Sequence, residues 1–395
     1  MDIFSKCHNF TDAKEVIKAG HYPYFIPMTK SDGTVAEYRG HKLIMCGSNN
    51  YLGLTTHPDV RKAAKDAITL FGTSCTGSRF LNGTLELHEQ LERELADWVG
   101  KPTSLVFATG MQVNLGTISA LLGRQDVVIL DKHDHASIVD GARLSWGRIE
   151  RFQHNDMEDL DRVLAEIPTT SGKMVIVDGV FSMEGDLSNL PEIVRLKNKY
   201  NTRLLVDDAH GVGVHGEKGR GTCEHFGLLG ETDIIMGTFS KAFASLGGFV
   251  VANHDVITHI KHRARALIFS ASMVPASVAC AQTALDIIKS EPERRKRLWD
   301  ITERVLKGFS KIGLDTGDSQ TPVIPVIIGE DERCFAFWKT LITNGIFSNP
   351  VISPATPPGR ALIRTSYMAT HTDEDIDIVL DVFDRCSQEF ELVKK

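Results

Sequence analysis

The stretch GTFSKAFASLGGF, residues 237–249, contains a single charged side chain, Lys241, among small, hydroxylated and apolar residues. The flanking segments 233–236 and 247–252 are apolar and are predicted to be buried strands. Lysine is almost never fully buried without a partner, and burial lowers the pKa of its amine, which is how Schiff-base lysines are made. A lysine on a tight turn that reaches water fits the same stretch, so these residues alone leave both interpretations open.

The chain around this stretch alternates short apolar, β-branched runs with helical patterns at 85–98, 112–122, 157–167 and 190–199. Strand segments in which apolar residues follow one another, without alternating with polar residues, are typical of a mostly parallel sheet that is covered on both faces. The sequence therefore predicts an α/β fold. The expected strands are 104–108, 127–131, 174–178, 203–208, 233–237 and 249–252.

Three segments are expected along the chain. Residues 1–50 are predicted to be an N-terminal extension with one helix at 13–19, and residues 51–290 a large domain. After Glu291-Pro292 the pattern changes to a long charged helix, then strand, helix, strand and a final helix from residue 373 to about residue 390. Residues 291–395 are therefore expected to form a smaller C-terminal α+β domain.

Composition restricts the class of protein. The 395 residues are 42% apolar and 24% charged, which is ordinary for a globular protein, and the net charge of −7 argues against a nucleic-acid partner. The N-terminus MDIFSKCHNF has no apolar core, and no run approaches the roughly 18 apolar residues of a membrane span. The cysteines are dispersed, as expected of reduced thiols in a cytoplasmic protein: Cys7, Cys46, Cys75, Cys223, Cys280, Cys334 and Cys386.

Polar side chains follow five successive strands of the predicted sheet, where ligands of such sheets bind. After the first strand, Gly110 and Met111 precede a helix whose free backbone N–H groups can bind phosphate. Because these strand ends share one edge, we expect a site there. The next four ends offer His133 and His135, then Ser182, then Asp207 and His210, and finally Thr238 and Lys241.

Each of these residues also has a simpler interpretation. His133 and His135 can ligate a metal, but no third ligand has a suitable spacing, so no metal is expected and His133 is placed in a surface loop. Asp207 and Asp208 can simply cap a turn. GVGVHG, residues 211–216, matches the dinucleotide pattern G-x-G-x-x-G, but the glycine-rich residues after it predict a loop and not a helix.

Pyridoxal 5′-phosphate uses all of these parts, because it needs a lysine for its aldehyde, an anion at its pyridine nitrogen and a phosphate cradle. Asp207 would keep the ring nitrogen protonated, so that the ring accepts charge from the substrate α-carbon. His135 can stack on the ring, while Ser182 and His210 can bond its phenolic oxygen. Thr238 adds a hydroxyl to the phosphate site at the helix N-terminus.

The chain resembles the α-oxoamine synthase family of fold-type I pyridoxal-phosphate enzymes over nearly its whole length. The resemblance implies an aspartate-aminotransferase-like fold and the assignments made above, with Lys241 as the residue that carries the cofactor. It is carried by GSNNYLGLTTHP, GTSCTGSRFLNGT, DHASIVDGARLS, DGVFSMEGD, VDDAHGVGVHGEKGRG, GTFSKAFASLGGF, FSASMVP, SPATPPG and RTSYMATHT.

The resemblance also implies substrate-binding residues and a second subunit. Arg364 is expected to bind the amino-acid carboxylate, for which its fork is suited, with Asn50 and Ser78 also in substrate binding. Ser270 and Ser272 match residues that reach the phosphate from the neighbouring subunit, so a homodimer with shared sites is expected.

The family's reaction is a decarboxylative Claisen condensation of an amino acid with an acyl-CoA thioester. GTFSKAFASLGGF together with the loop at 344–359 favours L-serine and palmitoyl-CoA, which give 3-ketosphinganine, CoA and CO2. Some relatives carry an arginine before the PATP-type loop, where this chain has Ile352-Ser353, so sister reactions with glycine, alanine or cysteate stay open. A non-catalytic partner subunit of the same fold is the alternative from another class. The basic stretch KHRARA, residues 261–266, suits either CoA phosphates or a solvated helix face, and a lipid product allows weak membrane association.

Overall fold

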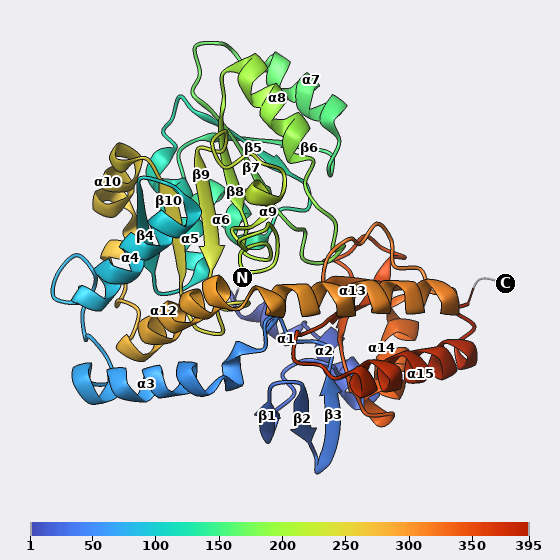
Figure 1. The fold of residues 1–395 in the computed structure, drawn as a ribbon. Helices are drawn as coiled ribbons and strands as arrows, with labels where there is room; N and C mark the ends of the chain where they lie inside the picture. The colour runs from blue at the N-terminus through green and yellow to red at the C-terminus, as the bar shows by residue number, and fades with distance from the viewer. Residues whose placement is uncertain (1, 394–395) are drawn as a thin grey trace. The chain divides into compact units, whose positions relative to one another are not determined.

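The computed structural model describes residues 2–393, and the chain divides into two compact units (Figure 1). The larger unit comprises residues 49–299, and the smaller unit combines the residues up to 48 with those from 300 onward. The domain boundaries predicted from the sequence lie after residues 50 and 290, and residues 1–50 were predicted to form a separate N-terminal extension. In the structure this segment shares a sheet with the C-terminal residues, because β3 (His41–Met45) pairs in parallel with β12 (Ile346–Phe347).

The larger unit is built on a seven-stranded sheet in the order β4-β10-β9-β8-β7-β5-β6. Only β10 runs antiparallel to its neighbours β4 and β9, and the other pairs are parallel. The predicted mostly parallel sheet is confirmed. The strands are β4 (Thr103–Phe107), β5 (Val127–Asp131), β6 (Arg148–Phe152), β7 (Lys173–Asp178), β8 (Arg203–Asp207), β9 (Ile234–Thr238) and β10 (Gly248–Ala252).

The central strands are buried on both faces, and every residue of β5, β9 and β10 is buried. Alternate strand residues such as Leu130, Ile176 and Met236 form one apolar cluster with residues of α5, α6, α10 and α11, so these helices cover the same face. The helices of this unit are α3 (Pro58–Phe71), α4 (Glu86–Val99), α5 (Gly110–Leu121), α6 (Ala136–Leu144), α7 (Met157–Glu166), α8 (Leu190–Tyr200), α9 (Thr222–His225), α10 (His254–Arg263), α11 (Arg265–Ile268) and α12 (Pro275–Ser290), with a 3₁₀ turn at Leu54–Thr56.

The smaller unit contains two sheets, β1-β2-β3-β12 and β11-β14-β13. Its core joins α13 (Pro292–Ile312) to the last helix, since the rings of Phe309 and Phe383 lie 4.8 Å apart among buried aliphatic residues. The remaining elements are α1 (Ser5–His8), α2 (Asp12–Lys18), β1 (Lys30–Asp32), β2 (Val35–Tyr38), β11 (Val323–Gly329), α14 (Asp331–Thr343), β13 (Asn349–Val351), β14 (Ala361–Ser366) and α15 (Asp373–Glu389).

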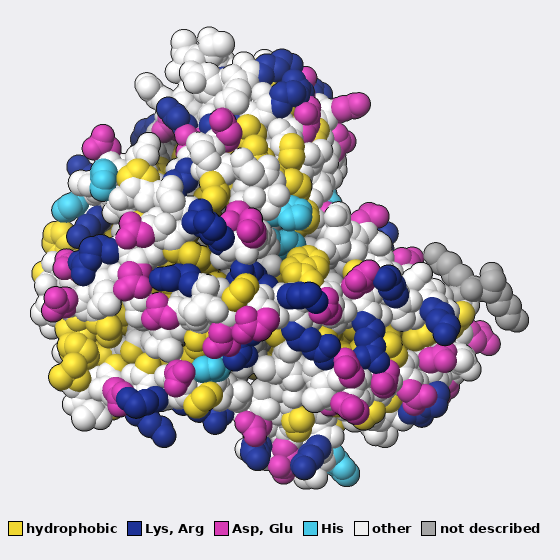
Figure 2. All heavy atoms as spheres, viewed as in Figure 1, with side chains coloured by type: hydrophobic (Ala, Val, Ile, Leu, Met, Phe, Trp, Pro, Cys, Tyr) yellow, Lys and Arg dark blue, Asp and Glu magenta, His cyan; other side chains and the backbone are white. Residues whose placement is uncertain are grey.

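On the face shown in Figure 2, basic and acidic side chains are interspersed, which gives that face no broad field of one sign. Among residues 2–393, no helix combines the length and the apolar composition that crossing a bilayer requires.

Candidate active site

A cavity of about 280 Å³ lies in the larger unit where five of the parallel strands end. The residues that line it come from the last residues of β7, β8 and β9 and from the segments after β4, β5, β7, β8 and β9, which are the five strand ends that the sequence singled out. Eight predicted site residues line this one cavity: Gly110, Met111, His135, Ser182, Asp207, His210, Thr238 and Lys241. The other lining residues are Thr109, Ser137, Asp178, Ala209, Met236, Ser240 and Leu246.

The N-terminus of α5 forms one wall of the cavity. Thr109 caps the helix, and its side chain accepts a hydrogen bond of 3.1 Å from the backbone N–H of Gln112, which leaves the N–H groups at the start of the helix for an anion. A Cβ atom on Gly110 would lie 2.7 Å from Thr238 Oγ1, so only glycine lets the helix approach this hydroxyl so closely. A helix N-terminus beside a hydroxyl suits a phosphate group.

Asp207 is the last residue of β8 and is only 3% exposed. Its Oδ1 accepts a hydrogen bond of 3.0 Å from the backbone N–H of Ala209, and its Oδ2 accepts one of 2.6 Å from Asn114 Nδ2. These donors fix the orientation of the carboxylate at the cavity wall. Asn114 was missed by the sequence analysis, and it is one of several polar residues in α5.

His135 precedes α6 and is joined to Asp207 through two buried side chains. Its Nδ1 accepts from the backbone N–H of Ser137 at 3.2 Å and lies 2.7 Å from Ser137 Oγ, which in turn accepts from Asn114 Nδ2 at 2.9 Å. Partial burial lowers the pKa of His135, and the charge of Lys241 adds to this effect while that of Asp207 opposes it. Because Nδ1 accepts from a backbone N–H, it carries no proton in this arrangement, and the ring is neutral.

His210 receives a contact that the sequence did not predict. Tyr51 Oη lies 2.7 Å from His210 Nδ1, and both residues are buried. Tyr51 follows Asn50 in the stretch SNNYLGL. Because the hydroxyl of a buried tyrosine usually has a hydrogen-bond partner, the contact with His210 is the one that the hydroxyl requires. The pair fixes the orientation of the His210 ring at the cavity.

Asp178 is a second carboxyl group at the cavity, and the sequence analysis missed it. It ends β7 as Asp207 ends β8, and its Oδ2 accepts from the backbone N–H of His135 at 2.7 Å. Burial raises the pKa of Asp178 well above its usual value, and the neighbouring charge of Asp207 raises it further.

Lys241 follows β9, is half-buried and lines the same cavity as Asp207. The structure therefore places its amine beside the candidate site. Thr238 Oγ1 donates to the carbonyl of Gly247 at 3.0 Å and so closes the turn that carries this lysine.

Five predicted residues do not line the cavity. Asn50 bonds to Thr55 Oγ1 at 2.9 Å, while the hydroxyls of Ser78 and Ser272 are buried with no hydrogen-bond partner among the described residues. Ser270 Oγ accepts a hydrogen bond from Gln112 Nε2 at 2.8 Å, next to the start of α5. Arg364 lies in the smaller unit on β14 and is 5% exposed, so it is not a surface residue.

The glycine-rich stretch GVGVHG and Asp208 have structural roles. Residues 211–221 form turns, and the next helix begins only at Thr222, which confirms the predicted loop at GVGVHG. Asp208 accepts from the backbone N–H of Thr222 at 2.6 Å and holds this loop. Within residues 2–393, no group of three or more His, Cys, Asp and Glu side chains is arranged to hold a metal ion.

The residues at the cavity fit the pyridoxal phosphate implied by the resemblance. The N-terminus of α5, where Gly110 has no Cβ, fits the phosphate. The buried carboxylate of Asp207, whose two oxygens each accept a hydrogen bond, fits the pyridinium nitrogen. The neutral imidazole of His135 and the amine of Lys241 complete the set that this cofactor needs.

Known proteins are similar to this chain in fold and in sequence. The family model described as aminotransferase class I and II matches residues 41–383. A serine palmitoyltransferase of Sphingobacterium spiritivorum is 48% identical over 97% of this chain and 96% of its own, and an 8-amino-7-oxononanoate synthase of Thermoanaerobacter pseudethanolicus is 40% identical over 96% of each. A solved structure of a serine palmitoyltransferase variant from S. paucimobilis, with a bound PLP–myriocin aldimine, superposes with a TM-score of 0.96 at 37% identity over the full length of both chains. The cavity at the strand ends, the sheet that carries it and the match along the sequence agree, and the chain belongs to the aminotransferase class I and II family.

Proposed function

We propose that this protein is a pyridoxal-phosphate-dependent acyltransferase that condenses L-serine with palmitoyl-CoA to give 3-ketosphinganine, CoA and CO2. The observation that carries the proposal is the single cavity lined by Lys241, Asp207 and His135 beside the N-terminus of α5. It is supported by 48% identity to a serine palmitoyltransferase over nearly the whole of both chains.

Pyridoxal phosphate, when bound, supplies a sink for the negative charge that develops at the α-carbon of the amino acid. The side chains at the cavity hold the cofactor ring in position. The carboxylate of Asp207 pairs with a cationic ring nitrogen, and the donors at its two oxygens keep it oriented before any substrate arrives, which is electrostatic preorganisation.

Lys241 and His135 move and hold the protons of the reaction. Lys241 Nζ takes the proton from the substrate α-carbon, a task for which an amine must be neutral and close. The neutral ring of His135 is assigned to stack in the site, and its Nε2–H is free of the Ser137 contact, so it can donate to the thioester carbonyl oxygen where charge develops.

Substrate binding is assigned to residues outside the cavity lining. We assign the serine carboxylate to Arg364, with Asn50 and Ser78 as further contacts, because a buried arginine with a planar fork binds a carboxylate in two places. Ile352 and Ser353 stand where some relatives carry an arginine, so this chain relies on Arg364 for that charge.

The assembly proposed with this function is a homodimer with shared sites, in the cytoplasm, with weak membrane association through the lipid product. Ser270 and Ser272 are the residues assigned to the neighbouring subunit's phosphate. Within its own chain, Ser270 Oγ accepts a hydrogen bond from Gln112 Nε2. Sedimentation of the purified protein tests the dimer.

The test of the function is product formation by the purified protein with palmitoyl-CoA and each of L-serine, glycine, L-alanine and L-cysteate. We expect 3-ketosphinganine by mass spectrometry with serine and the largest change of cofactor absorbance with serine. A preference for another amine would assign the chain to a sister synthase. A protein with no cofactor absorbance and no product would support the non-catalytic subunit instead.

A further inference from the structure

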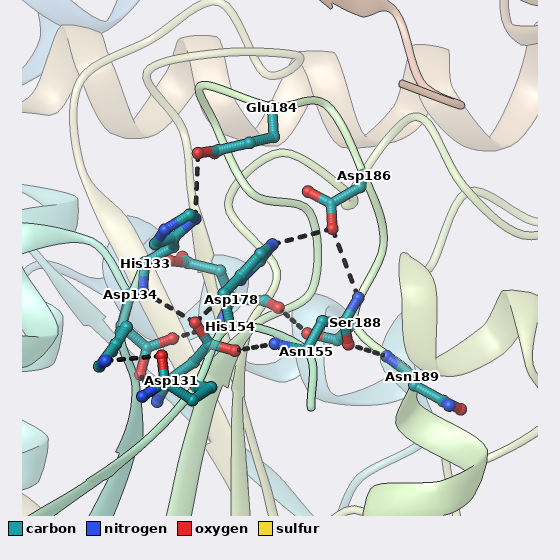
Figure 3. A network of polar contacts seen from close by, with 12 residues as sticks. Asp131, His133, Asp134, His154, Asn155, Asp178, Glu184, Asp186, Ser188 and Asn189 are labelled. Atoms are coloured by element: carbon teal, nitrogen blue, oxygen red, sulfur yellow. Dashed lines mark hydrogen bonds and ion pairs between the residues drawn. The ribbon is translucent and has the colours of Figure 1, made fainter. Parts of the chain in front are cut away.

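His154, which the sequence analysis did not single out, lies between two buried carboxylates from different segments (Figure 3). Its Nδ1 is 2.9 Å from Asp131 Oδ1, and its Nε2 is 3.1 Å from Asp186 Oδ2. Neither carboxylate oxygen has a proton to give when ionised, so both ring nitrogens act as donors and the imidazole carries a positive charge.

The surroundings of His154 favour this charged form. Burial lowers the pKa of His154, but the hydrogen bonds and charges of Asp131 and Asp186 outweigh it and raise the pKa to about 10. The ring also stacks on His133, with centroids 4.0 Å apart and planes 14° apart. His133 in turn pairs with Glu184 at 3.0 Å, which is a further titratable group near His154.

The first carboxylate belongs to the turn that carries His135. Asp131 ends β5, and its Oδ1 accepts from the backbone N–H of His133 at 2.8 Å, two residues before the ring that lines the cavity. Asp134 ties the same turn to β7, because its two oxygens accept from the backbone N–H groups of Asp131 and Asp178. The position of His135 is therefore set by the geometry around Asp131.

The second carboxylate belongs to the loop that carries Ser182. The backbone N–H of Phe181 donates to the carbonyl of Asp186 at 3.0 Å, so Ser182 lies inside a loop closed by this pair. The His154 ring also packs edge-on against Phe181 with centroids 4.4 Å apart. One imidazole thus contacts both ends of the loop.

We propose that His154 is a positioning residue for the reaction: its charged ring ties the turn that bears His135 to the loop that bears Ser182 and holds both side chains in place at the cavity. This inference deepens the proposed function and rests on it. The side chain of Asp186 depends on its hydrogen bond with His154. It is 7% exposed, its Oδ1 has no partner among the described residues, and its Oδ2 is held by His154 and by a longer contact of 3.3 Å from Asn155.

The test is a double-mutant cycle in the holoenzyme with His154→Gln, Asp186→Asn and the double variant. The control is His259→Gln, an exposed histidine that bonds to the carbonyl of Ala120 elsewhere on the unit. The readouts are kcat and KM for serine, the visible circular dichroism of the bound cofactor, and the unfolding midpoint. Displacement of a positioned group by about 1 Å costs on the order of 100-fold in rate, so we expect each single variant to lose about 10- to 100-fold in kcat.

A positioning role further predicts that KM for serine changes little, that the circular dichroism band changes shape, and that the double variant is no slower than His154→Gln, because the two residues act as one unit. A lower unfolding midpoint with unchanged kcat and unchanged dichroism would overturn the proposal and leave His154 a purely structural residue. Additive losses would overturn it too. If no variant and not even the unmodified protein made product, the proposed function would fail, while the dichroism of the cofactor would still decide the role of His154.

Discussion

Asn114 Nδ2 donates a hydrogen bond of 2.6 Å to Asp207 Oδ2, from the middle of helix α5 to the end of strand β8. The same nitrogen donates to Ser137 Oγ, whose neighbour in the network is His135. One buried amide therefore orients the carboxylate on one side of the cavity and, through a hydroxyl, the imidazole on another.

Replacing Asn114 by Leu should weaken cofactor binding while the fold is kept. The change removes the side-chain donor of Asp207 Oδ2, and a hydrogen bond to a charged group contributes about 1.5–3 kcal/mol, which is about 10- to 100-fold in affinity. Titration of the apoprotein with pyridoxal phosphate measures this. Asn198→Leu, at an exposed position of α8, is the matched control. Equal affinities in all three proteins would contradict the role of Asn114.

Replacing Lys241 by Ala should abolish turnover and leave the cofactor loosely held. Lys241 is the amine at this cavity that is assigned to both the cofactor aldehyde and the α-proton, so no other group supplies either task. Borohydride treatment followed by peptide mapping should place the cofactor on the peptide 237–249 of the unmodified protein and on no peptide of the variant. Lys65→Ala, at an exposed position of α3, should label and turn over normally. A label found on another lysine would remove the assignment.

Replacing Gly110 by Ala should reduce cofactor affinity because the new methyl group would lie 2.7 Å from Thr238 Oγ1 and narrow the space at the start of α5. The additional change Thr238→Ala should not restore binding, because it removes a hydroxyl assigned to the phosphate and leaves the Cβ of residue 238, which lies 3.1 Å from the position of the new methyl group. Gly230→Ala is the control, since a Cβ there meets nothing within 4 Å. Competition by inorganic phosphate shows whether the loss concerns the phosphate site.

The sheet and its strand ends were predictable because their signals are local. Apolar runs marked the central strands, and polar residues directly after them marked the cavity edge. The strand β6 was missed because its sequence RIERF mixes charged and apolar residues, as an edge strand that pairs only with β5 can. Helix α3 was missed although its proline start and its apolar spacing are in the sequence.

The contacts behind the site were not predictable in the same way. Tyr51 and His210 are 159 positions apart, and nothing near either residue indicates the other. His154 and Asp186 likewise meet only because β5, β6 and β7 are neighbours in the sheet. In contrast, Asp178 stands at a strand end just as Asp207 does, so the same rule would have found it.

His215 should make the protein sensitive to acid independently of catalysis. Its side chain is 1% exposed, neither ring nitrogen has a hydrogen-bond partner among the described residues, and its ring packs edge-on against Trp299. Burial lowers the pKa of His215 to about 3 from the ordinary value of 6.5. Between these two pH values the unfolded chain binds a proton that the folded chain does not, so stability falls as the pH falls, by up to about 1.4 kcal/mol for each unit of pH.

His215→Phe keeps a flat ring against Trp299 without a titrating group. The urea unfolding free energy of the variant should therefore fall less steeply than that of the unmodified protein between about pH 6.5 and about pH 4, and the two curves should run parallel above about pH 7.5, where both states of His215 are neutral. His262→Phe, at an exposed position of α10, is the control and should keep the original slope. Identical slopes for the His215 variant and the unmodified protein would mean that the folded chain protonates this ring, and with it that the ring has access to water.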